Sequence, residues 1–99
     1  MYDLPTYVME YDKTLFKKAI ECAFNYIELQ DDIVGVIYAN PSTIKRIVIE
    51  FSDEVIFDYV YQGIGRFRTA YLIYLPSVKE NGILFLNQHE TFKLKLSLI

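Results

Sequence analysis

The residues best suited to bind a charged ligand are two pairs of cations in the C-terminal half. Arg66 and Arg68 flank Phe67, and Lys93 and Lys95 have the same spacing. Alternate side chains of a strand point to opposite faces, so each pair would share one face. If the two strands were neighbours, the four cations would line one patch, with tyrosines available for stacking. Such a patch suits a phosphate backbone or single-stranded bases.

Two other interpretations of these cations stay open. An acidic protein surface would fit the same patch equally well. Edge strands also carry Lys and Arg simply because charge blocks the pairing of one sheet with another.

Catalytic and metal chemistry have little support in the sequence. The single histidine, His89, lies in the polar segment 87–91, where a solvated loop residue is expected. The single cysteine, Cys22, falls on the apolar side of an expected helix, where a thiol is usually an inert core group. One Cys and one His this far apart do not form a zinc site. We therefore expect no catalytic residue, no cofactor and no metal, and a protein that is not an enzyme.

Composition indicates one domain spanning residues 1–99, with more apolar material than its size requires. The chain is 53% hydrophobic, its mean hydropathy is +0.16, and one cysteine cannot close an internal disulfide. Some apolar surface should remain exposed on a monomer, which favours a homodimer. The longest apolar runs, 33–39 and 70–75, are too short to cross a membrane. The N-terminus does not resemble a signal peptide, so an intracellular location is expected.

The net charge of −3 argues against non-specific coating of nucleic acid, but the charge is unevenly distributed. Residues 1–58 contain eleven acidic and five basic side chains, whereas residues 59–99 contain two acidic and five basic ones. Such an imbalance can mark an interaction face, or the two halves can complement each other within one fold or across a dimer.

Apolar periodicity predicts one helix followed by strands. Apolar residues recur every three or four positions over 13–29, and Asp12 is placed to cap that helix. After the helix, strands are expected at 33–39, 44–51, 55–61, 66–75, 83–87 and 92–99, with 33–39 central and with turns at 40–43, 63–65 and 79–82. The segment 6–11, before the helix, could form a further short strand. The fold class is therefore α+β, with one amphipathic helix (about 13–29) packed on a mostly antiparallel sheet of five to six strands.

Two points of this prediction remain open. Residues 53–62 fit a strand, because β-branched and aromatic side chains dominate them, but Asp53 and Glu54 also resemble a helix start. The second face of the sheet needs a cover, because one helix cannot bury all the apolar strand residues. The side chains expected there are Val48, Ile56, Val60, Leu72 and Tyr74.

The general character of the chain resembles a known group of viral proteins. It is a compact single domain with nine tyrosines and with seven lysines against three arginines. In these respects it is similar to the small orphan proteins of filamentous viruses that infect hyperthermophilic acidophilic archaea, of the Acidianus filamentous virus type. The resemblance implies a thermostable viral protein acting inside an infected host cell. Some small acidic proteins of that group neutralise host defence complexes.

Two functional hypotheses follow from the sequence. The first is a non-enzymatic interaction protein, a homodimer formed through exposed sheet surface, with a host component as a further partner. The alternative is a nucleic-acid-binding accessory protein that uses Arg66, Arg68, Lys93 and Lys95.

Overall fold

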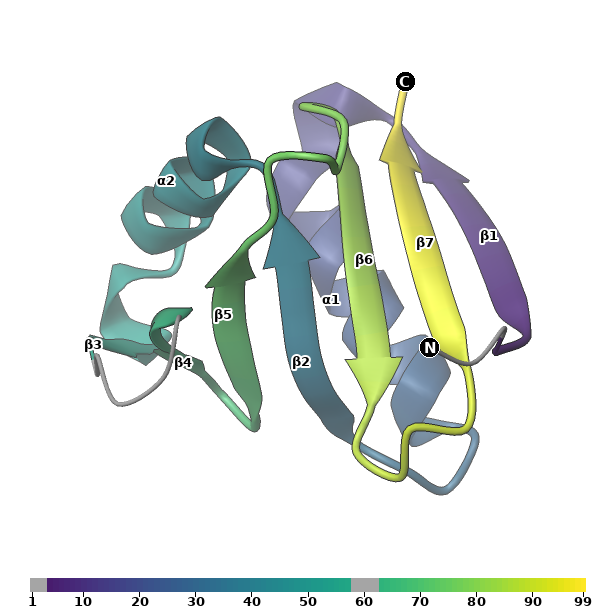
Figure 1. Cartoon of the computed structure of the whole chain (residues 1–99). Helices are drawn as coiled ribbons and strands as arrows, with labels where there is room; N and C mark the ends of the chain where they lie inside the picture. Colours follow the sequence, from purple (N-terminus) through teal and green to yellow (C-terminus); the bar gives the residue numbers. More distant parts are fainter. Residues whose placement is uncertain (1–3, 58–62) are drawn as a thin grey trace.

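The computed structural model describes residues 4–57 and 63–99. Within these residues, two α-helices, two short 3-10 helices and seven strands follow one another along the chain (Figure 1). They are β1 (Thr6–Tyr11), η1 (Lys13–Leu15), α1 (Phe16–Glu28), β2 (Val34–Ala39), α2 (Pro41–Glu50), η2 (Ser52–Glu54), β3 (Val55–Phe57), β4 (Gly63–Phe67), β5 (Ala70–Tyr74), β6 (Gly82–Asn87) and β7 (Lys93–Leu98). No helix in the described ranges is long and apolar enough to span a bilayer.

The strands form one mixed sheet in the order β1-β7-β6-β2-β5-β4-β3. β1 pairs with β7, and β2 with β5, in parallel, while the other four neighbouring pairs are antiparallel. The prediction of an α+β fold with a central strand at 33–39 is confirmed. The expected five to six strands and single helix were too few, because the described residues hold seven strands and a second helix.

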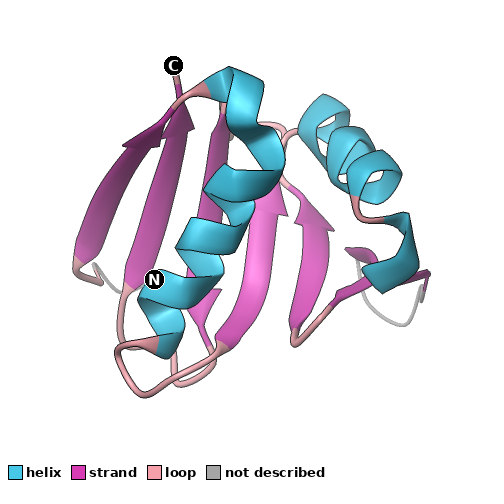
Figure 2. Cartoon of the chain, turned by 180° about the vertical axis from the view of Figure 1, so that it is seen from behind, coloured by secondary structure: helices cyan, strands magenta, loops and turns pink. Residues whose placement is uncertain are grey.

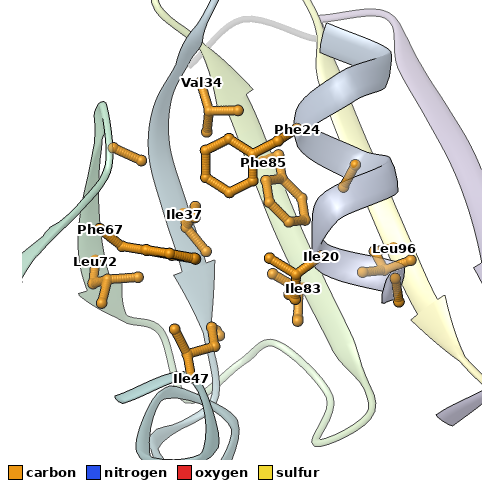
Figure 3. Close-up of a cluster of buried hydrophobic side chains, with 14 of the residues drawn as sticks. Ile20, Phe24, Val34, Ile37, Ile47, Phe67, Leu72, Ile83, Phe85 and Leu96 are labelled. Carbon is orange, nitrogen blue, oxygen red and sulfur yellow. The ribbon is translucent and has the colours of Figure 1, made fainter. Parts of the chain in front are cut away.

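Both helices lie on the same face of the sheet (Figure 2). The core fills the space between them and the strands: Ile20 and Phe24 of α1 and Ile47 of α2 point toward Ile37 and Phe85 of the central strands (Figure 3). All five side chains are buried. The sheet therefore has one face covered by helices and one face that neither helix covers.

The helix α1 forms where apolar periodicity predicts it. The Asp12 carboxylate accepts a hydrogen bond from the Thr14 amide at 2.9 Å, as expected of an N-cap. The first turn, Lys13–Leu15, is a 3-10 helix, and the α-helix proper begins at Phe16. Its apolar stripe is buried against the sheet.

The segment predicted as a strand at 44–51 is instead the helix α2, and the expected turn at 40–43 is its start. Asn40 caps it by accepting from the Ser42 amide, and Pro41 occupies the first helical turn, where its missing N–H costs nothing. Ile44 and Ile47 are buried, three residues apart, as on one face of a helix. A strand was predicted here because β-branched residues favour strands and because apolar Ile47 and Ile49 occupy alternate positions. The alternation is incomplete, since Val48 between them is also apolar.

The predicted strand 66–75 is two strands joined by a tight turn, and the predicted breaker 63–65 is part of β4. Arg68 adopts a left-handed backbone conformation with φ 56°, which reverses the chain between β4 and β5. At Gly65 a Cβ atom would come within 2.3 Å of the Ile56 carbonyl oxygen, so only glycine allows β3 to pair this closely.

A turn does occur at 79–82, where the Gly82 amide donates to the Lys79 carbonyl. The pair Asn81-Gly82 would suit a type I′ turn, but neither residue has the positive φ value that this turn needs. The turn also does not join neighbouring strands, since β2 lies between β5 and β6.

The open question at 53–62 is answered for its first part. Ser52–Glu54 is a 3-10 helix, Val55–Phe57 is a strand as favoured, and 58–62 lie outside the described residues. The set predicted for the second sheet face was mostly wrong. Leu72 is buried under the helices, and Val48 belongs to α2. Tyr74 follows the outward-facing Ile73 in β5 and therefore points to the helix side. Ile56 does face away from the helices, and Val60 lies outside the described residues.

Candidate functional site

The surface best placed to bind a partner is the face of the sheet opposite the helices, here called the open face. Figure 1 looks onto it, with α1 behind the strands. Ile37, Phe85 and Leu94 are buried on the helix side, so their neighbours in each strand point outward. The outward side chains are Thr6, Val8 and Glu10; Lys93, Lys95 and Ser97; Leu84 and Leu86; Val36 and Tyr38; Tyr71 and Ile73; Arg66; and Ile56.

One row of these side chains crosses all seven strands in register. Its members are Thr6, Lys93, Leu86, Val36, Tyr71, Arg66 and Ile56. The strands carrying Lys93 and Arg66 are not neighbours, because β6, β2 and β5 lie between them. Four interstrand steps of about 4.8 Å separate the two residues by roughly 19 Å. Lys93, Lys95 and Arg66 therefore share a face but flank an apolar centre instead of forming one compact patch.

Arg68 does not join them, because its turn directs it to the helix side. Its Nε donates to a Glu54 carboxylate oxygen at 2.7 Å, and its Nη2 also pairs with Glu21 of α1. The guanidinium lies over Phe24, 5.0 Å from the ring centroid. The hydrogen bond to Glu54 raises the pKa of Arg68 above its usual range and lowers that of Glu54. Arg68 therefore links α1, η2 and the β4–β5 turn. Its guanidinium is engaged in these internal contacts and is not part of the open face.

The other three predicted site residues remain accessible. The Arg66 guanidinium lies over the Tyr71 ring, 5.4 Å from its centroid, and Tyr71 is 41% exposed. Lys93 and Lys95 form no ion pair with any residue in the described ranges. The open face thus presents two lysines on one side and a stacked arginine–tyrosine pair on the other.

Between them the open face is hollowed. A groove of about 590 Å³ lies over the centre of the sheet, and a second hollow of about 300 Å³ lies beside Arg66 and Tyr71. Both reach the β6–β7 turn at Glu90. The main groove is lined by Tyr38, Leu75, Leu84, Leu86, His89 and Lys93, among others. It is an apolar surface with polar groups at one end, as binding grooves commonly are.

A hydrogen-bonded cluster holds the β6–β7 turn at that end. The Asp32 side chain is only 8% exposed, and its carboxylate accepts a hydrogen bond from the side-chain Nδ2 of Asn87 at 2.6 Å and lies 2.9 Å from Nδ1 of His89. Asn87 Oδ1 in turn accepts from the Thr91 and Phe92 amides. Burial acts to raise the pKa of Asp32, but the bonds from His89, Ile33 and Asn87 outweigh it and lower the pKa to about 2.

The sequence predicted His89 as a solvated loop residue, and its side chain is 71% exposed, but the pairing with Asp32 was not foreseen. Asp32 and His89 lie 57 positions apart, so no local pattern connects them. The described residues place no hydroxyl or thiol in hydrogen-bond contact with His89. Cys22 lies 3.7 Å from the Tyr11 hydroxyl, and the described ranges contain no group of three potential metal ligands.

The strand β1 gives the sheet a free edge. Among the described strands it pairs with β7 alone, and the Pro5 and Tyr11 carbonyls accept from the Lys93 and Ile99 amides. Successive peptide groups of a strand point to opposite sides, so Thr6, Val8 and Glu10 direct their N–H and C=O groups away from β7. No strand in the described part of the chain pairs with this row of backbone groups, and such a row is a template for another strand.

Comparison with known proteins adds no relative. No family model matches this chain, and no curated protein or solved structure resembles it significantly.

Proposed function

We propose that this chain is a non-enzymatic interaction protein that forms a homodimer through its exposed sheet surface, with β1 as the contact. The observation that carries this proposal is the free edge of β1, six residues long. The opposite edge strand, β3, has only three described residues in strand conformation.

Two-fold pairing of β1 with its copy would satisfy the outward backbone groups on both chains. Identical strands can meet antiparallel about a two-fold axis, because each then offers the other the same surface. Val8, which is 65% exposed, would be partly covered in such a contact, along with the exposed Tyr7. Natural edges are usually protected by proline, lysine or a bulge. Within Thr6–Tyr11 there is no proline or lysine, and Glu10 is the one charged residue.

Pairing through the edge fits the charges better than stacking of two open faces. Lys93, Lys95 and Arg66 all lie on that face, whereas Glu10 is the one carboxylate in its rows. Stacked open faces would therefore bring like charges together, which disfavours association. Edge pairing leaves the open faces of both copies accessible.

The test is the oligomeric state of wild type and two variants. Light scattering after gel filtration at micromolar concentration should give a dimer for wild type. Val8→Pro removes an outward N–H without touching a bond to β7 and should give a monomer. Val8→Thr keeps the N–H and the β-branched shape and should stay dimeric. Circular dichroism confirms that each variant is folded. A wild type that is strictly monomeric, or a folded V8P that remains dimeric, would overturn the proposal.

The setting of this function also belongs to the proposal. The resemblance to small proteins of archaeal filamentous viruses supports a role inside a host cell, directed at a host component. The unpaired thiol of Cys22 is consistent with an intracellular, reducing environment.

A further inference from the structure

We propose that the open face binds single-stranded nucleic acid, with Lys93, Lys95 and Arg66 contacting phosphates and Tyr71 stacking on a base. This function goes beyond the interaction proposed for the β1 edge and does not depend on it. The residues differ from those expected from sequence, because Arg68 is held by internal contacts and Tyr71 takes its place.

The first argument is charge. The chain has a net charge of −3, yet the rows of the open face hold three cations and one carboxylate. Several carboxylates elsewhere are engaged within the protein. Glu21 and Glu54 pair with Arg68, Glu50 pairs with Arg46, and Asp12 caps a helix. Glu90 of the β6–β7 turn also lines both hollows, so the open face carries three cations against the two carboxylates Glu10 and Glu90. This positive balance on an acidic chain would be complemented by a polyanion.

The second argument is the stacking platform. Tyr71 is 41% exposed and Arg66 lies over its ring, so a base could stack on the tyrosine or on the guanidinium plane. Aromatic platforms on a sheet beside a basic groove recur in proteins that bind single strands, because every base has a flat π-face. Tyr38 lines the main groove on the neighbouring strand.

The third argument favours single strands over duplexes. The lysines and Arg66 are separated by roughly 19 Å of sheet, given the spacing between strands, and the surface between them is an apolar groove. A duplex keeps its bases stacked inside and would leave that groove unused. A single strand can place unstacked bases in the groove while its backbone reaches the cations on both sides.

The experiment measures the fluorescence anisotropy of labelled single-stranded thymidine and uridine oligonucleotides of about 20 nucleotides, titrated with protein at several salt concentrations. Wild type should bind at low salt and weaken as salt rises. The double variant Lys93→Gln/Lys95→Gln should lower the slope of log affinity against log salt by about 1.4, since each phosphate contact contributes about 0.7. Lys18→Gln/Lys45→Gln removes the same charge from exposed positions on the helices and should keep the wild-type slope.

Stacking is tested separately from charge. Tyr71→Ala should weaken binding roughly 5- to 150-fold, the range that alanine substitution of a stacking aromatic gives. Tyr71→Phe keeps the ring and should retain most of the affinity that Tyr71→Ala loses, and circular dichroism of both variants separates a stacking role from a loss of folding.

Three outcomes would overturn the proposal. They are undetectable binding of either oligonucleotide at low salt, equal losses in the open-face and helix-face lysine variants, and duplex DNA bound as tightly as single strands with Y71A unaffected. Folded V8P should still bind, so failure of the proposed dimer and failure of nucleic-acid binding give different results.

Discussion

Substitution of Asp32 by Asn should destabilise the protein at neutral pH but not in strong acid. The Asp32 carboxylate holds the β6–β7 turn through Asn87 and His89, and that turn forms one end of the main groove. Asparagine has nearly the same shape but no charge, so it cannot give the same charge-assisted hydrogen bonds. The variant therefore isolates what the ionised carboxylate contributes.

The magnitude follows from the pKa of Asp32, which falls from 3.8 to about 2 on folding. At 1.36 kcal/mol per pKa unit, ionised Asp32 stabilises the folded state by about 2 kcal/mol. Because the folded pKa is the lower one, this stabilisation is complete above the unfolded pKa, near pH 4 and upward. It is lost as pH falls through about 2, where the folded carboxyl is protonated as well.

Urea unfolding followed by circular dichroism, at pH 7, 5 and 2, measures this difference. D32N should be less stable than wild type by about 2 kcal/mol at pH 7 and 5, and nearly equal to it at pH 2. Asp31→Asn is the matched control, because Asp31 is exposed and its left-handed backbone, φ 59°, suits asparagine. A constant gap between D32N and wild type across this pH range would refute the reasoning, as would an equal loss in D31N.

Three further variants test the architecture. Ile47→Ala should lower the free energy of unfolding by about 2–4 kcal/mol, since Ile47 is buried in α2. Ile49 is 65% exposed, so Ile49→Ala should change it by less than about 0.5 kcal/mol. Equal losses for the two variants in urea titrations would indicate that this segment is a strand and not a helix. Gly65→Ala should lower the stability by about 1–3 kcal/mol, because the added Cβ would meet the Ile56 carbonyl of β3. Gly82→Ala should cost less in thermal unfolding, since its Cβ would lie 3.4 Å from the nearest atom, the Lys79 carbonyl oxygen. The reverse order would contradict this packing. Arg68→Met should lower the stability by about 1 kcal/mol through loss of the ion pair with Glu54, and by less at high salt. It should leave oligonucleotide affinity unchanged in anisotropy titrations. A variant that is as stable as wild type but binds more weakly would show that Arg68 contacts the nucleic acid.

Local patterns predicted the elements whose signals lie within one segment. The helix α1 combines a cap at Asp12 with an apolar stripe, and β7 alternates cleanly, so the outward position of Lys93 and Lys95 could be read directly. The helix α2 also carried a signal, because asparagine followed by proline is a frequent helix start. That signal was read as a turn because the β-branched residues after it favour strands.

The site depended on features that no local pattern contains. The order of strands decides whether Arg66 lies beside Lys93, and that order comes from pairings between segments far apart in the chain. The turn at Arg68 needs one left-handed residue, and arginine gives no hint of it, since glycine and asparagine are the usual choices. Once that turn forms, Arg68 moves to the helix face and meets Glu21, 47 positions away.

The two surfaces proposed for binding support each other geometrically. Antiparallel pairing of β1 with its copy would join two sheets edge to edge, with both open faces on the same side of the joined, twisted sheet. Only the two β1 strands would then separate the lysines of one copy from those of the other, three interstrand steps or about 14 Å apart. Four lysines would gather around the axis, where a passing strand of nucleic acid meets the highest density of positive charge. Since a ligand that contacts both copies favours the paired state by its differential affinity, dimer formation would strengthen binding at the open face without being required for it.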